Sequence, residues 1–169
     1  MRKNFIWVSL AMVLGIFTSF NALSYDGVIK FRGTIINNGC TISSSGGKEQ
    51  TIDFGKISKS ALGSTLGTVA ITKSFSIELT SCPGSAVGIE FIGTKDAHDP
   101  TLYSTKVSGA GILLAKDNGT KIDANTKVSG YTITAQKATI PLIAKLQSTH
   151  TTIGDGEINS DVNFTLIYP

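Results

Sequence analysis

The residues of this chain best suited to nucleophilic or metal chemistry are two cysteines and two histidines. Cys40 and Cys82 are the only cysteines. A catalytic thiol or a zinc site needs further ligands or a base at suitable spacing. Neither cysteine has another cysteine nearby, and both histidines are distant in sequence. We therefore expect Cys40 and Cys82 to form a disulfide if the chain reaches an oxidising compartment.

Other segments that resemble catalytic or metal motifs are better explained as loops. Residues 95–100 group His98 with two carboxylates, but they lack the ligand spacing of a metal scaffold and predict a polar turn. Residues 63–67 (GSTLG) resemble a nucleophile elbow, yet Thr65 is at the centre and no strand-to-helix context surrounds it. His150 lies in a Ser/Thr-rich stretch typical of a loop. We predict no catalytic residue, no metal site and no cofactor.

The first 24 residues have the three parts of a secretory signal peptide. The chain begins Met1-Arg2-Lys3, continues with an apolar run over residues 5–20, and then has small residues at Ala22 and Ser24. The apolar run is shorter than the ~20 residues that span a bilayer. We predict cleavage after Ser24, which leaves 145 of the 169 residues and lowers the formal charge from +3 to +1. The charge then gives no support for nucleic-acid binding.

The remaining chain has the length of one domain, and its apolar residues recur mainly at every second position. With 41% hydrophobic and 16% charged residues, the full 169-residue chain is neither a charged disordered chain nor a coiled coil. Asn118-Gly119 predicts a hairpin turn that returns the chain toward Ile122. Many short strands with frequent turns indicate a β-sandwich. We expect strands at 52–57, on both sides of a tight turn within 73–93, at 112–115, at 140–146 and at 162–168.

Apolar and polar residues alternate near both ends of the predicted mature chain, and this affects how many strands we expect. The last predicted strand ends one residue before the C-terminus, so we expect no strand after it. Near the N-terminus, the pattern alone is compatible with an ordinary first strand paired within its own sheet. One face of that segment has Ile29, Phe31, Gly33 and Ile35, and the other has Val28, Lys30, Arg32 and Thr34.

Taken in order and at their spacings, several segments resemble the chaperone–usher pilus subunits of type 1 and P fimbriae. The resemblance covers nearly all of residues 25–169. The segments are 31–36 leading into Cys40, 52–55, 73–79 leading into Cys82, 109–114 before 117–119, 141–144, and the closing Gly156, Asn159, Ser160, Phe164 and Tyr168.

The resemblance implies an all-β, immunoglobulin-like sandwich that lacks its seventh strand and has an N-terminal donor-strand extension. It divides the chain into a signal peptide (1–24), a donor segment (25–36) and a pilin domain (37–169). The donor face would comprise Ile29, Phe31, Gly33 and Ile35. The acceptor groove and chaperone contact would comprise Val162, Phe164, Leu166, Tyr168 and Pro169.

The implied function is that of a structural, non-enzymatic subunit of an adhesive surface fimbria. Such subunits are secreted through the periplasm, bind a periplasmic chaperone and an outer-membrane usher, and polymerise with neighbouring subunits by donor-strand exchange. A host receptor would be engaged only indirectly, and nucleic acid not at all. Two alternatives stay open: a minor tip or adaptor pilin, and a secreted β-sandwich binding module whose own N-terminal strand completes its sheet.

Overall fold

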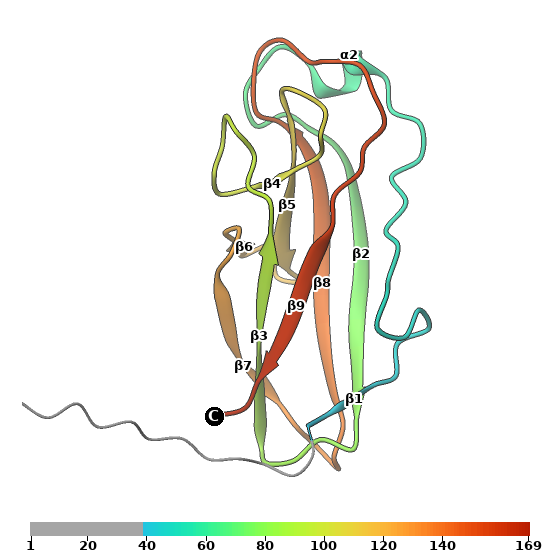
Figure 1. Cartoon of the computed structure of the whole chain (residues 1–169), viewed down its shortest axis with the longest axis vertical. Helices are drawn as coiled ribbons and strands as arrows, with labels where there is room; N and C mark the ends of the chain where they lie inside the picture. Colours follow the sequence, from blue (N-terminus) through green and yellow to red (C-terminus); the bar gives the residue numbers. More distant parts are fainter. Residues whose placement is uncertain (1–38) are drawn as a thin grey trace, which may run out of the picture. The chain divides into compact units, whose positions relative to one another are not determined.

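The computed structural model describes residues 39–169, and nearly all of its regular structure is β-strand (Figure 1). The predicted signal peptide and donor segment lie outside the described residues. One short helix, α2 (Lys59–Leu62), is present. The strands are β1 (Thr41–Ile42), β2 (Val69–Thr80), β3 (Ala86–Gly93), β4 (Tyr103–Ser104), β5 (Ala110–Lys116), β6 (Lys121–Ile122), β7 (Lys127–Thr132), β8 (Ala138–Ser148) and β9 (Val162–Ile167).

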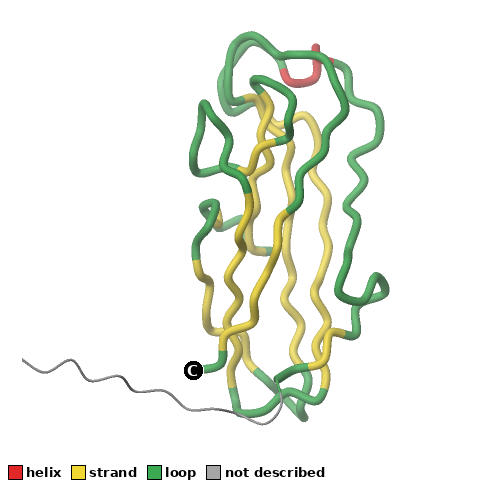
Figure 2. Tube along the Cα trace, in the orientation of Figure 1, coloured by secondary structure: helices red, strands yellow, loops and turns green. Residues whose placement is uncertain are grey.

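These strands form two antiparallel sheets. The larger sheet has the order β1-β2-β8-β5-β4, with β6 paired to β5, and the smaller has the order β7-β3-β9. Figure 2 shows the long strands running alongside one another with loops at their ends. The predicted all-β, immunoglobulin-like sandwich is confirmed. Within residues 39–169, no helix is long and apolar enough to cross a membrane.

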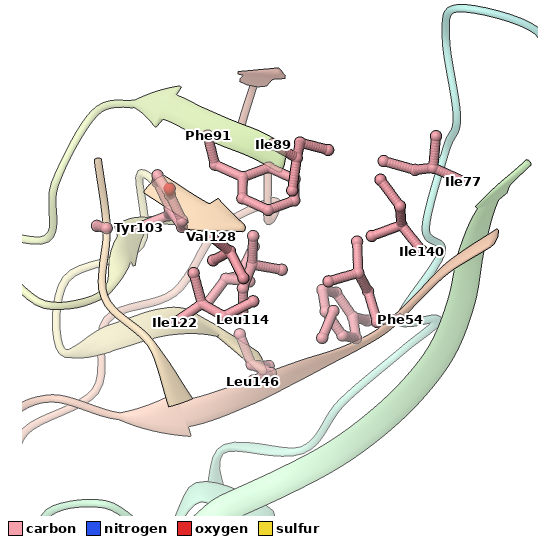
Figure 3. Packing of buried hydrophobic residues seen from close by; sticks show 14 of the residues in the cluster. Phe54, Ile77, Ile89, Phe91, Tyr103, Leu114, Ile122, Val128, Ile140 and Leu146 are labelled. Carbon is pink, nitrogen blue, oxygen red and sulfur yellow. The ribbon is translucent and has the colours of Figure 1, made fainter. Parts of the chain in front are cut away.

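The core lies between the inner faces of the two sheets. On the larger sheet, β2 and β8 pair so that Ile77 lies opposite Ile140, and both are almost completely buried. On the smaller sheet, Ile89 and Phe91 of β3 point into the same interior (Figure 3). The period-two pattern of the sequence arises because alternate side chains face this core.

The chain passes from one sheet to the other through the predicted turn between β2 and β3. Cys82 lies in this turn, and its disulfide to Cys40 is formed as expected. Because Cys40 immediately precedes β1, the bond holds the start of the described chain against the crossover. The predicted Asn-Gly hairpin is also present, with the Gly119 N–H donating to the Lys116 carbonyl at 2.9 Å.

The strand predicted at 52–57 is wrong, because this segment has no regular strand pairing. Its side chains do reach the core, since Phe54 is buried and Ile52 and Ile57 are partly buried. Its backbone turns locally, however: Gly55 has a φ of +72°, and its N–H donates to Asp53 Oδ1 at 2.7 Å. Alternating burial therefore arises here without a neighbouring strand.

The two-residue turn between β7 and β8 has an unusual sequence for its geometry. Thr134 and Lys137 exchange backbone hydrogen bonds of 2.9 Å. Between them, Ala135 and Gln136 have φ values of +49° and +60°. This is the type I′ arrangement, which normally contains Asn-Gly because other residues are strained at positive φ.

Replacing Ala135→Asn and Gln136→Gly together should relieve this strain. We expect the free energy of unfolding in urea to rise by about 1 to 2 kcal/mol. Gln147→Gly is the matched control, because it places glycine at a strand position without positive φ and should destabilise by about 1 kcal/mol. A paired variant less stable than wild type would contradict the prediction.

Removing the disulfide with Cys40→Ala and Cys82→Ala should lower the free energy of unfolding by roughly 4 kcal/mol, because the bond closes a long loop in the unfolded chain. Urea unfolding of the oxidised wild type and of the variant measures this difference. The control is the reduced wild type, which should behave like the variant. Equal midpoints for oxidised and reduced wild type would show that the bond does not contribute to stability.

Candidate functional site

The most distinctive feature of the sandwich is the free edge of β9. This strand pairs with β3, from Val162 opposite Gly93 to Ile167 opposite Gly88. Within residues 39–169, no strand pairs with the other edge of β9. A free edge offers unpaired N–H and C=O groups to any strand that lies beside it. The smaller sheet therefore has room for one more strand next to β9.

A groove of about 680 Å³ lies between β9 and the segment 48–54. β9 and the residues just before it form one wall, and segment 48–54 forms the other. The floor comes from the inner faces of both sheets, whose side chains in the groove are apolar. The apolar lining residues are Ile42, Ile52, Phe54, Phe75, Ile77, Phe91, Ile112, Leu114, Ala144, Val162 and Phe164.

Several of these side chains are incompletely buried even though they belong to the interior. Ile52, Phe75, Val162 and Phe164 pack against the core cluster but remain only partly buried. In a closed sandwich, side chains at such positions would be covered by a strand between the two walls. The groove is therefore an opening into the hydrophobic core.

The wall formed by segment 48–54 is attached to β2 through few polar contacts. Gln50 Nε2 donates to the Ser76 carbonyl at 3.3 Å, and further back Ser43 N–H donates to the Glu78 carbonyl at 2.8 Å. A second cavity of about 470 Å³ lies along β2 beside this wall. Hydrogen bonds from the Ser76 and Thr139 hydroxyls lower the pKa of the Glu78 carboxyl at the edge of that cavity.

The structure separates the predicted acceptor residues into two groups. Val162 and Phe164 line the groove. Leu166 and Tyr168 pack against the core without being among the groove-lining residues, and Pro169 is exposed at the chain end. The predicted donor residues Ile29, Phe31, Gly33 and Ile35 lie outside the described residues.

Sequence reasoning missed the opposite wall and the floor of the groove. Ile52 and Phe54 form part of that wall, and Phe75 and Ile77 on β2 lie beside it. Both pairs alternate in the sequence, which was a signal for an inward face. Alternation could not indicate that this particular inward face is left open.

The segments considered as metal or catalytic candidates form turns. Asp96 Oδ1 accepts hydrogen bonds from the backbone N–H groups of His98 and Asp99, both at 3.0 Å, and so holds the 96–99 turn. The His98 and His150 rings lie 4.7 Å apart between centroids. Within residues 39–169, no three His, Cys, Asp or Glu side chains are grouped to hold a metal ion.

The chain is similar to known fimbrial proteins. The fimbrial protein family model matches residues 29–169. An uncharacterized fimbrial-like protein of Escherichia coli K12, YdeS, is 31% identical, with 98% of each chain covered. Long polar fimbria protein A of Salmonella typhimurium is 27% identical, over 99% of this chain and 98% of its own.

A solved structure shares the fold. A chain in the structure of a chaperone–usher pilus superposes with a TM-score of 0.65 at 22% identity, covering 86% of this chain and 96% of that one. This likeness agrees with the two-sheet fold of residues 39–169. The chain belongs to the fimbrial protein family.

Proposed function

We propose that this structural, non-enzymatic fimbrial subunit polymerises by donor-strand exchange, with its groove accepting residues 25–36 of the next subunit. The observation that carries the proposal is the groove along the free edge of β9, which exposes apolar side chains of the core. An inserted strand would satisfy the β9 backbone and cover the exposed interior. Strand addition of this kind derives affinity from main-chain hydrogen bonds and specificity from alternate side chains.

The sequence of the donor segment suits such a groove. Ile29, Phe31 and Ile35 lie on one face of an extended strand and would enter the opening. Burying three large apolar side chains contributes roughly 5 to 9 kcal/mol before any hydrogen bond is counted. Gly33 lies on the same face, where the lack of a side chain would let the strand pass a crowded part of the groove.

The groove must also be covered before assembly, because a free sheet edge above an exposed core promotes aggregation. We propose that a periplasmic chaperone supplies a temporary strand during secretion. Its contacts would include Val162, Phe164 and Leu166 along β9, and Tyr168 and the terminal carboxylate of Pro169 beyond it. An outer-membrane usher would then exchange this strand for the donor segment of the next subunit, and the polymer would reside in a surface fimbria.

A charge placed in the groove should prevent strand insertion. In the Phe164→Asp variant, a synthetic peptide of residues 25–36 should bind at least 100-fold more weakly than to wild type, because the inserted strand would bury an unpaired carboxylate. Fluorescence anisotropy of a labelled peptide measures the affinity. Thr165→Asp is the matched control, since Thr165 lies on the same strand but is exposed and does not line the groove. If the mature chain is instead a stable monomer whose residues 25–36 resist protease, it completes its own sheet and the proposal fails.

The Phe31→Asp variant should be unable to add to a preceding subunit, while its own groove still binds the 25–36 peptide. The reason is that Phe31 lies on the proposed donor face, where a carboxylate would be buried on insertion. Thr34→Asp, on the opposite face, should polymerise nearly as well as wild type. Polymer yield on non-boiled gels measures the difference, and an unchanged yield for Phe31→Asp would rule out the assigned donor face.

A further inference from the structure

The first two described residues, Gly39 and Cys40, contact Tyr168, the penultimate residue of the chain. The Tyr168 hydroxyl accepts a hydrogen bond from the backbone N–H of Cys40 at 2.6 Å, across 128 residues of sequence. A Cβ atom built on Gly39 would lie 2.8 Å from the same hydroxyl and 3.2 Å from the adjacent ring carbon. The glycine backbone therefore packs directly against the tyrosine ring, in a space that a side chain would fill.

This contact joins three parts of the subunit at one point. Cys40 is bonded to Cys82 in the crossover between the sheets. Tyr168 follows the last residue of β9, Ile167, which lies opposite Gly88 of β3. Gly39 is the first residue that the structure describes. The end of the groove-forming strand, the disulfide and the first described residue are thus held together.

Tyr168 has a different environment from the groove residues of β9. Val162 and Phe164 line the groove, whereas Tyr168 does not. Its hydroxyl is engaged by its own chain, which gives Tyr168 a role within the subunit in addition to the chaperone contact proposed above. Holding one end of a segment in place lowers the entropy cost of its binding.

We propose that Tyr168 is a positioning residue for the donor function of the same subunit, because it holds Gly39 and Cys40, the residues that follow the N-terminal segment in sequence. This inference rests on the proposed strand exchange. We expect Tyr168 to affect how fast a subunit adds to its predecessor. The affinity of the subunit's own groove for a strand should depend on Tyr168 much less.

The first test is Tyr168→Phe, which removes the hydroxyl and keeps the ring. The mature chain is refolded with excess 25–36 peptide, so that its groove is filled. Amide exchange at Cys40 should become about fivefold faster, as expected for the loss of one hydrogen bond. Tyr131→Phe is the matched control, because the Tyr131 hydroxyl is buried without a hydrogen-bond partner among residues 39–169. If the amide exchange rate of Cys40 is unchanged in Tyr168→Phe, the hydrogen bond does not protect this amide and the inference is wrong.

The second test measures donor and acceptor functions separately. A groove-filled donor is mixed with a wild-type acceptor whose groove holds a shortened, displaceable peptide. Tyr168→Phe should lower the donor rate, the rate at which the donor subunit adds to the acceptor, about fivefold. The affinity of the variant's own groove for the 25–36 peptide should change less than twofold. If the donor rate is unchanged, or if peptide affinity falls as much as the donor rate, the inference about Tyr168 is wrong while the proposed function stands. If wild-type donor does not add at all, the proposed function itself fails, and the inference fails with it.

Gly39→Ala tests the same contact from its other side. The added methyl should displace the Tyr168 hydroxyl and lower the donor rate about as much as Tyr168→Phe does. In the Tyr168→Phe background, the additional effect of Gly39→Ala should be smaller, because the shared contact is already weakened. Fully multiplicative losses would show that the two residues act independently and would contradict the assignment.

Discussion

The structure depends on a backbone constraint: β9 has hydrogen-bonding partners on one edge only. Unpaired strand edges are tolerated at protein surfaces, but here the free edge borders an opening into the core. A strand inserted there would meet two requirements together, since it would pair with the backbone and cover Val162, Phe164 and their neighbours. The polymerisation that we propose follows because one inserted strand meets both requirements.

The rest of the sandwich keeps its shape without that strand because the larger sheet is extensive. β2 and β8 pair along most of their length, from Val69 opposite Gln147 to Leu79 opposite Ala138. The disulfide adds a constraint near β1, worth roughly 4 kcal/mol against the 5 to 15 kcal/mol of an ordinary domain. These features support the floor of the groove, whereas segment 48–54 is attached to β2 by few polar contacts.

The contact at Tyr168 connects this arrangement to the first described residues. β9 forms a groove wall, and Tyr168, the residue after Ile167, accepts a hydrogen bond from the backbone N–H of Cys40 across 128 residues of sequence. Because Cys40 is also bonded to Cys82, the contact links the end of the groove-forming strand to the crossover between the sheets.

The sequence by itself determined the features that depend on local pattern: the alternating strands around Phe75, Ile77 and Phe164, the Asn-Gly hairpin, the single possible disulfide and the family resemblance. Only the tertiary structure decided that 52–57 is not a strand, that Ile52 and Phe75 border an open groove, and that Tyr168 binds Cys40. The physical reason is that alternation reports which side chains share a face, whereas pairing, openness and long-range contacts depend on what lies beside that face.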